Sequence, residues 1–401
     1  MAVCFPSNTE FAVAGGRQLR PAGIWLRAGI RGWQLWFVAR WPIQSVSMSE
    51  SSVLSGFLLV VAILASGCNP GAELVARQIF SAPNSRPKQG FECSQAVQDV
   101  AKRAYADVFE VPVSSAILQV AIVERGEYEF SWHPKIDGGR VWADGPIRLD
   151  FTRDNRPPRG LILMLHGFGL CKEQMLPWAF EFASSGYRVA TVDLRGHGAS
   201  TGRWVGFGAL EKKDLEKVLD AIESRSRWDN LPVGVLGVSY GASVGLDFAA
   251  QDPRVRAVVA LEPFASARDA IPELARAAFP GVASRISDGL FQEALSVGAR
   301  RALFNWSDAD TVRSVSEIHY PILFIHGAAD GWLSPEHSRR LLRLAAAGSR
   351  LFVVPGENHV SLPLEVGKLA PEIRTWFRAH LAGRADGLAA TAPSRSSSAP
   401  M

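Results

Sequence analysis

The sequence has only four cysteines in 401 residues, and none of them lies in a Cys-x-x-Cys pair or in a Cys/His cluster. Structural zinc sites require such spacings, so we expect no metal and no cofactor. Cys93 and Cys171 could pair in an oxidising compartment, but two separate structural thiols are the simpler interpretation.

The chain also lacks basic runs and basic helix faces, although its net charge is +4. Residues 1–67 hold five arginines and two acidic residues, so they carry +3 of that charge and the rest is nearly neutral. A nucleic-acid interface needs clustered positive charge. We therefore expect no nucleic-acid partner.

Near the front of the chain, an apolar run covers residues 53–65. It falls short of the ~20 apolar residues that a membrane-spanning helix needs, but it suits the core of a signal peptide. The following Leu64-Ala65-Ser66-Gly67-Cys68 resembles a bacterial lipoprotein cleavage box, although Ala65 replaces the usual Leu and Glu50 stands where positive charge is expected. This resemblance implies lipidation of Cys68 and a membrane-anchored place in the cell envelope. An uncleaved anchor, a secreted or periplasmic protein, and a buried helix are the alternatives.

In the body of the chain, the spacing of apolar residues predicts a helix over 94–109 and strands over 115–131 and 139–152, joined near Gly138. Short apolar runs then alternate with helical stretches, a pattern typical of a parallel sheet that helices cover on both faces. The predicted strands are Leu161–Leu165, Arg188–Val192, Val233–Gly237, Val255–Leu261, Ile322–Ile325 and Arg350–Val354. The predicted helices are Leu210–Ser224, Tyr240–Ala250, Pro335–Ala346 and Pro363–Ala382.

The third of these strands runs directly into Gly237-Val238-Ser239-Tyr240-Gly241, where a helical pattern begins at once. A serine at the tip of a strand–turn–helix needs small neighbours, because the turn is strained and crowded. The setting predicts that Ser239 is a nucleophile.

A serine hydroxyl needs a base, and the base needs a carboxylate to orient it. His359 follows the last predicted strand, and Asp330 follows the strand before it, which gives the chain order Ser, acid, His. Glu262 follows an earlier strand and is the alternative acid. His166 and His326 lie in strand-end His-Gly pairs and are expected to shape turns.

Acyl chemistry also needs two N–H donors for the developing oxyanion. We expect these to be the backbone amides of Tyr240, directly after the serine, and of Phe168 in the loop His166–Gly169.

Together, the motifs His-Gly-Phe-Gly, Asp193-Leu-Arg-Gly-His-Gly, Gly-Val-Ser-Tyr-Gly, His-Gly-x-x-Asp330 and the terminal Asn-His359 resemble the α/β-hydrolase superfamily, in its serine aminopeptidase-like and esterase-like branch. The resemblance covers roughly residues 145–382. It implies an α/β-hydrolase fold with a mostly parallel sheet, and enzymes that need no metal.

About 60 residues separate the strands at 255–261 and 322–325, far more than an ordinary connection. We expect helices there, forming a cap over the site; packing at the sheet edge is the alternative. The predicted organisation is listed in order along the chain: 1–47 a doubtful extension, 48–67 a signal peptide, 68–92 a linker, 93–382 the hydrolase domain with its cap at 264–318, and 383–401 a disordered tail.

The leading functional hypothesis is a serine hydrolase that cleaves a carboxylic ester or related acyl compound through Ser239, His359 and Asp330. A serine peptidase or acyltransferase of the same fold, or a non-catalytic membrane-tethered binding protein, are the alternatives. The expected partners are a small acyl substrate or a peptide, and a membrane through the N-terminal segment. The sequence leaves the oligomeric state open.

Overall fold

The computed structural model describes residues 69–85, 94–137, 140–225 and 231–381, all within the larger of two units, Gly67–Met401. The predicted extension, signal peptide, lipidation site Cys68 and C-terminal tail lie outside the described residues, as does Cys93. Among the residues that are described, no helix is both long and apolar enough to cross a membrane.

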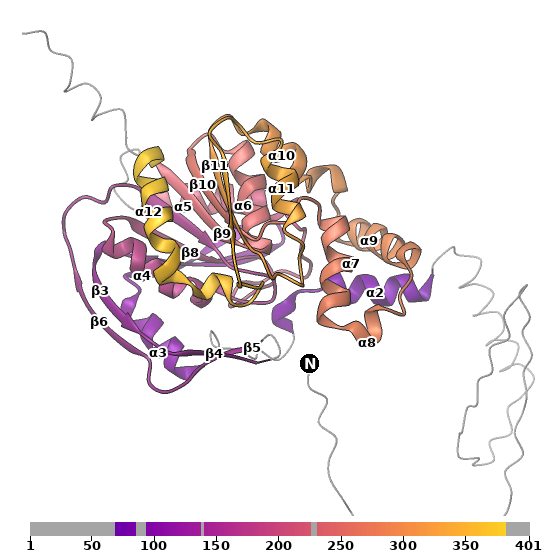
Figure 1. Ribbon diagram of the computed structural model, residues 1–401, viewed down its shortest axis with the longest axis horizontal. Helices are drawn as coiled ribbons and strands as arrows, with labels where there is room; N and C mark the ends of the chain where they lie inside the picture. The colour runs from indigo at the N-terminus through magenta and orange to yellow at the C-terminus, as the bar shows by residue number, and fades with distance from the viewer. Residues whose placement is uncertain (1–68, 86–93, 138–139, 226–230, 382–401) are drawn as a thin grey trace, which may run out of the picture. The chain divides into compact units, whose positions relative to one another are not determined.

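An eight-stranded sheet forms the centre of the fold, in the order β1-β2-β8-β7-β9-β10-β11-β12 (Figure 1). The first three strands pair antiparallel and the strands from β8 to β12 pair parallel. Its strands are β1 (Asp107–Val113), β2 (Ala116–Val123), β7 (Leu161–Leu165), β8 (Arg188–Asp193), β9 (Val233–Val238), β10 (Val255–Leu261), β11 (Ile322–Gly327) and β12 (Arg350–Val354). All six strands predicted after residue 160 are therefore confirmed, and so is the mostly parallel sheet.

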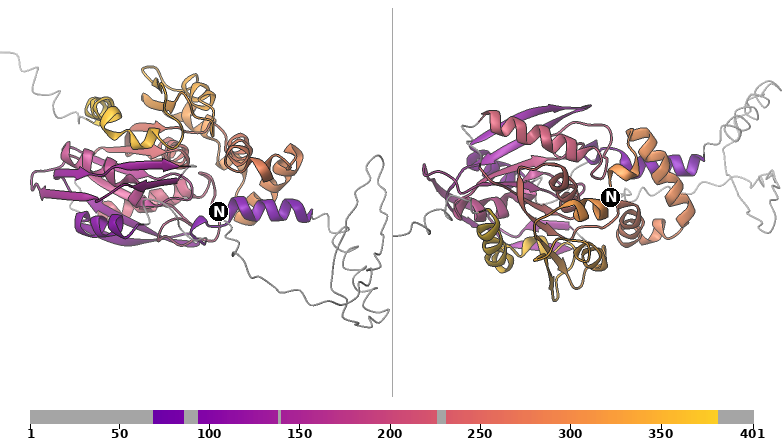
Figure 2. Two further views of the ribbon diagram at one scale, coloured as in Figure 1. Left: turned by 60° about the horizontal axis from the view of Figure 1, so that its bottom comes forward. Right: turned by 90° about the horizontal axis from the view of Figure 1, so that it is seen from above.

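Helices cover both faces of this sheet (Figure 2). Successive residues of β7 enter opposite cores. Leu163 belongs to the core that contains residues of α5 (Glu211–Arg225) and α6 (Tyr240–Gln251), while Met164 belongs to the core with residues of α4 (Leu176–Ser184) and α12 (Val366–Leu381). Because both faces are buried, the strand is apolar throughout, and its period-2 alternation divides it between two cores.

Before β7, the chain forms more and shorter strands than the sequence predicts. The expected helix ends early, as α3 (Gln95–Ala104), because β1 begins at Asp107. The two predicted strands are replaced by β2 of the main sheet and two small antiparallel pairs. These pairs are β3 (Gly126–Ser131) with β6 (Arg148–Arg153), and β4 (Pro134–Asp137) with β5 (Arg140–Ala143). The hairpin near Gly138 is confirmed, since Asp137 pairs with Arg140.

Part of the predicted linker is a helix, α2 (Pro70–Phe80), followed by the short 3₁₀ turn η1 (Pro83–Ser85). Asn69 caps α2, and its buried residues Ala72, Ala76 and Phe80 recur every four positions. This stripe packs against α9, where a Cβ added at Gly298 would lie only 2.1 Å from the Phe80 ring. Residues 70–80 therefore belong to the folded unit, and the expectation of a linker is wrong for them.

The long connection after β10 contains helices, as predicted. They are α7 (Ala267–Ala278), α8 (Pro280–Ala283), α9 (Asp288–Ala302), the turn η4 (Trp306–Asp308) and α10 (Thr311–Glu317). α9 packs against both α2 and α7, whereas α10 packs on α6. α11 (Glu336–Leu342) and the turn η5 (Leu362–Leu364) complete the chain, and α11 is shorter than predicted.

The helix α6 contains a buried carboxyl group, Asp247, which is 1% exposed. One of its oxygens accepts a hydrogen bond from the Thr311 hydroxyl at 3.4 Å, and the other has no partner in the described parts of the chain. Burial raises the pKa of Asp247 to about 7, despite opposing hydrogen bonds from α10 and the charge of Lys212. Its folded-state pKa therefore lies above the ordinary value of 3.8.

We predict that Asp247→Asn makes the protein more stable at alkaline pH. Between the two pKa values the native state binds the extra proton, so the free energy of unfolding falls as pH rises through this window. The variant lacks this fall and should exceed the wild type by roughly 3–4 kcal/mol above pH 8, but match it near pH 4.

Urea unfolding across this pH range measures the effect. Burial also raises the pKa of Asp214, to about 6. This group makes the free energy of unfolding depend on pH in the same way in both proteins, so the difference between their two stability curves reports Asp247 alone. A constant gap at all pH values would contradict the prediction.

Candidate active site

Ser239 lies in a sharp turn between β9 and α6. Its backbone has φ 51° and ψ −113°, a conformation that costs a non-glycine residue of order 1–3 kcal/mol. The Ser239 N–H donates to the carbonyl of Leu261 at 2.7 Å, which holds the turn to the end of β10.

The two glycines around the serine are required by space. A Cβ at Gly237 would lie 2.3 Å from the carbonyl oxygen of Gly241, and a Cβ at Gly241 would lie 2.4 Å from that of Leu165. Real side chains do not tolerate such distances to backbone atoms. The strained strand–turn–helix predicted around Ser239 is thus present.

His359 lies beside the serine, in the loop that follows β12. Its Nε2 is 2.9 Å from Ser239 Oγ, and its Nδ1 is 2.7 Å from Asp330 Oδ2. An ionised carboxylate can only accept a hydrogen bond, so the proton belongs on Nδ1. Nε2 is then left with its lone pair directed at the Ser239 hydroxyl.

Asp330 is held as an anion by several donors in the loop after β11. Its Oδ1 accepts from the N–H groups of Trp332 and Leu333, both at 2.9 Å. Burial opposes ionisation, but hydrogen bonds from His326 and His359 outweigh it and hold the pKa of Asp330 well below its usual range. The carboxylate is therefore negatively charged at neutral pH.

The alternative acid, Glu262, also reaches this point. Its Oε2 is 3.5 Å from His359 Nδ1, beyond the range of a good hydrogen bond. Burial, followed by the charge of Asp330, raises the pKa of Glu262 well above its usual value. The structure thus brings both predicted acids to the imidazole, with Asp330 the nearer one.

The two residues predicted to supply N–H donors lie close together, since the Phe168 and Tyr240 ring centroids are 5.5 Å apart. Tyr240 is the first residue of α6, and Phe168 lies in the loop after β7, where the Gln174 side chain accepts the N–H of Gly167 at 2.8 Å. Within the described ranges, neither the Phe168 nor the Tyr240 N–H donates to a protein group. The Phe168 ring is 42% exposed and stacks on Phe207 with centroids 6.0 Å apart.

His166 and His326, which we predicted to shape turns, both lie within hydrogen-bond distance of backbone groups in neighbouring loops. His166 Nδ1 lies 2.8 Å from the Gly167 carbonyl, and its Nε2 accepts the N–H of Leu194. His326 lies between the Ser338 hydroxyl and the Leu333 carbonyl, and 3.2 Å from Asp330 Oδ2. Both imidazoles are fully buried.

A buried ion pair that our sequence reasoning missed anchors the loop after β7. Asp193 accepts from the Lys172 ammonium at 2.9 Å and from the Lys172 N–H at 2.6 Å, while Ala199 donates to the same carboxylate. Asp193 ends β8, and its position in the Asp193-Leu-Arg-Gly-His-Gly motif was the signal that could have revealed this role. The pair ties the loop after β7 to the end of β8.

Two groups in the described chain could offer three metal ligands: Cys171 with Glu173 and Asp193, and Glu262 with Asp330 and His359. In the first, Lys172 Nζ bonds both carboxylates at 2.9 Å and already supplies the positive charge. In the second, His359 is hydrogen-bonded through both ring nitrogens. Neither arrangement calls for a cation.

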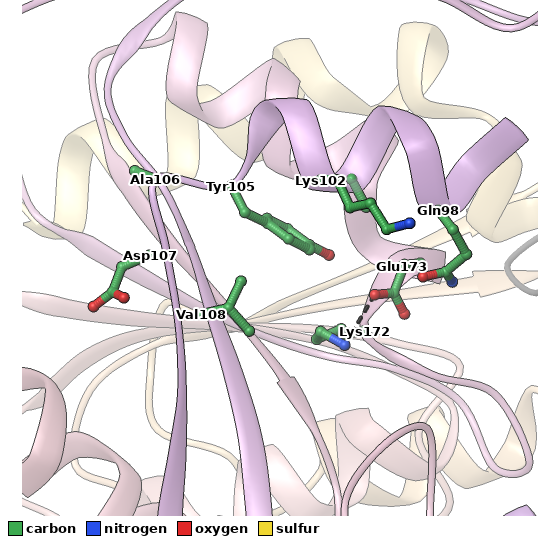
Figure 3. A pocket seen from close by; sticks show the side chains of 9 residues that line it. Gln98, Lys102, Tyr105, Ala106, Asp107, Val108, Lys172 and Glu173 are labelled. Carbon is green, nitrogen blue, oxygen red and sulfur yellow. Dashed lines mark ion pairs between the residues drawn. The ribbon is translucent and has the colours of Figure 1, made fainter. Parts of the chain in front are cut away.

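A cavity of about 410 Å³ opens between α3, the start of β1 and the turn η3 (Lys172–Met175) (Figure 3). The Lys172–Glu173 ion pair forms part of its wall, so the charge of this lysine is already compensated. Ser239, His359 and Asp330 do not line it. The cavity is therefore separate from the hydrogen-bonded Ser239–His359–Asp330 chain.

Known proteins resemble parts of this chain in sequence and share its fold. Residues 156–291 match the family model described as serine aminopeptidase, S33, a segment that includes Ser239 but ends before Asp330. Two solved structures share the fold: an esterase of Pyrococcus furiosus and 2,6-dihydroxy-pseudo-oxynicotine hydrolase, each with a TM-score of 0.51. The first is 16% identical and covers 74% of this chain and 98% of its own; the second is 21% identical and covers 71% of each. Together with the sheet order described above, these likenesses show that the chain has the α/β-hydrolase fold.

Curated relatives match either over a short segment or at less than 30% identity. A 31.7 kDa protein of Escherichia coli is 35% identical over 107 residues, which is 26% of this chain and 37% of the relative. YfhR of the same organism is 29% identical, over 60% of this chain and 83% of its own. The monoacylglycerol lipase of Mycolicibacterium smegmatis is 27% identical, over 59% and 95%. The chain spans between 37% and 64% of the length of the first relatives it matches.

Proposed function

We propose that the protein is a serine hydrolase that cleaves a carboxylic ester or related acyl compound through a covalent acyl-enzyme. The observation that carries the proposal is the unbroken hydrogen-bond chain from Ser239 Oγ through His359 to Asp330, with links of 2.9 and 2.7 Å. The esterase among the structures of the same fold and the lipase among the relatives agree with this class of substrate.

In the proposed acylation step, Ser239 Oγ attacks the acyl carbon while His359 Nε2 takes the hydroxyl proton. Asp330 stabilises the resulting imidazolium through the Nδ1 proton. The carbonyl oxygen becomes an oxyanion, for which the N–H groups of Phe168 and Tyr240 are the proposed donors. The tetrahedral intermediate then collapses, and the imidazolium returns its proton to the departing alcohol.

Deacylation repeats these steps with water as the nucleophile. His359 takes a proton from water, the hydroxide adds to the acyl carbon, and Ser239 leaves with the proton that the imidazolium returns. The products are a carboxylic acid and free enzyme. If an amine or alcohol replaces water, the same intermediate gives an acyltransferase.

Labelling with a fluorophosphonate tests the nucleophile. We predict that wild-type protein is phosphonylated at Ser239, because the activated oxygen displaces fluoride from phosphorus, and that Ser239→Ala is not. Ser316→Ala, which changes an exposed serine on α10, is the matched control and should label like wild type. A folded wild-type protein that neither labels nor hydrolyses esters would favour the binding-protein alternative.

The labelled protein is then assayed on esters of increasing acyl length and on aminoacyl and peptide amides. Preference for the esters supports the proposed function, whereas preference for the amides would identify the peptidase alternative. Adding an acceptor alcohol during ester turnover shows whether acyl transfer competes with hydrolysis.

A further inference from the structure

Glu262 enters the site from the strand between those that lead to Ser239 and Asp330. It directly follows β10, which is paired with β9 on one side and β11 on the other. Its N–H donates to the Ile325 carbonyl at 2.8 Å, and its backbone has φ 54°, a value that a non-glycine residue adopts only when its surroundings impose it. The sheet therefore fixes this side chain beside the imidazole.

The Glu262 carboxyl group is completely buried, and neither of its oxygens has a hydrogen-bond partner among the described residues. A Cβ at Gly327 would lie 3.2 Å from Oε1, so the backbone of β11 closes one side of the group. Burial makes the ionised form costly, and the charge of Asp330 adds to that cost, so together they outweigh the nearby N–H of Gly327. Glu262 therefore carries a proton while Asp330 is charged.

The charged and titratable groups around Glu262 come from three directions. Asp330 and His326 lie on and after β11, and His359 and Glu357 lie in the loop after β12. One oxygen each of Glu262 and Asp330 and a nitrogen of His359 all lie within 4.8 Å of one another. Two carboxyl groups so close to one imidazole cannot easily share it as two anions.

We propose that Glu262 is a reserve acid of this site: a positioning residue that stays neutral while Asp330 is charged, and that orients His359 when the Asp330 charge is lost. The inference rests on the proposed function. Without the charge at position 330, Glu262 gives its proton to solvent. Its Oε2 then closes the 3.5 Å gap and accepts the Nδ1 proton of His359.

The test is a double-mutant cycle in which ester hydrolysis is measured over a range of pH. Removal of the acid from such a triad typically costs ~10⁴-fold in kcat. With the reserve acid in place, we expect Asp330→Asn to lose only about 10–100-fold, and its kcat/KM to rise with pH as Glu262 ionises. Asp330→Asn/Glu262→Gln should lose at least a further ~30-fold and should lack this rise.

The effect of Glu262→Gln should be at least tenfold larger in the Asp330→Asn background than in wild type, as expected for coupled neighbours. Glu336→Gln, at an exposed position of α11, is the matched control in both backgrounds. If Asp330→Asn is as inactive as the double variant, or its rate does not rise with pH, the reserve role is wrong.

If the Glu262 variants do not fold, the pH profile of Asp330→Asn is compared with that of the wild type, because deprotonation of the imidazole base raises kcat/KM with pH in both. A rise in Asp330→Asn at higher pH than in the wild type supports the reserve acid, and coinciding profiles refute it. Wild-type labelling and turnover keep the two proposals apart. An inactive, unlabelled wild type refutes the proposed function, whereas an active wild type with no reserve behaviour refutes only the role of Glu262.

Discussion

Replacing His359 by alanine is expected to lower kcat for ester hydrolysis by roughly 10³–10⁶-fold, while the protein stays folded. The imidazole Nε2 lies 2.9 Å from Ser239 Oγ and takes the proton on which nucleophilic attack depends. Without it the serine hydroxyl keeps its proton and is a poor nucleophile. The remaining rate would come from binding and from the Phe168 and Tyr240 amides, which the substitution leaves in place.

Single-turnover and steady-state assays on one activated ester measure this loss, and fluorophosphonate labelling should slow in parallel. His319→Ala is the matched control, because that histidine is exposed and lies just after α10. Added imidazole should restore part of the rate of His359→Ala, since the substitution opens space next to Ser239. A variant that keeps more than a tenth of the wild-type rate would show that another group is the base.

Much of this site could be predicted from the sequence, because its residues follow buried parallel strands. The apolar runs of β9 and β12 identify where each strand ends, and side chains at such ends meet at one edge of the sheet. Ser239 and His359 therefore come together in space although 120 residues separate them.

The choice of acid could not be made in the same way. Asp330 and Glu262 follow neighbouring strands, and both reach the same imidazole nitrogen, at 2.7 and 3.5 Å. The two distances differ by less than one ångström. Asp330 is the nearer acid because the N–H groups of Trp332 and Leu333 hold its carboxylate in place, and these hydrogen bonds form only in the folded loop.

The helix α2 shows a second limit. Its stripe of Ala72, Ala76 and Phe80 is short, and it lies between the apolar run at 53–65 and the predicted domain, in the segment that we predicted to be a linker. This stripe is buried because it packs against α9, where Gly298 leaves space for the Phe80 ring. Gly298 is more than 200 residues away in the sequence. Local periodicity cannot reveal a partner at that separation.

The second large effect is expected at Gly241, the last residue of the turn that carries Ser239. A Cβ there would lie 2.4 Å from the Leu165 carbonyl oxygen and 2.5 Å from that of His166. These are backbone atoms at the end of β7, which is held between β8 and β9 and cannot move aside. Gly241→Ala should therefore cost at least the ~3 kcal/mol at the upper end of ordinary overpacking, and often yield no soluble protein.

Gly289→Ala is the matched control, because Gly289 also lies in the first turn of a helix, α9, but a Cβ there meets nothing within 4 Å. Alanine should stabilise that helix by about 0.5–1 kcal/mol, so the two substitutions are expected to act in opposite directions. Thermal unfolding of both variants measures the contrast.

Any Gly241→Ala protein that does fold must displace the end of β7, and with it the loop that carries the Phe168 amide. It should therefore lose activity beyond its loss of stability, at temperatures where it is still folded. If Gly241→Ala unfolds at the wild-type temperature and keeps full activity, the prediction is wrong. The turn around Ser239 would then be looser than its φ of 51° and its two crowded glycines require.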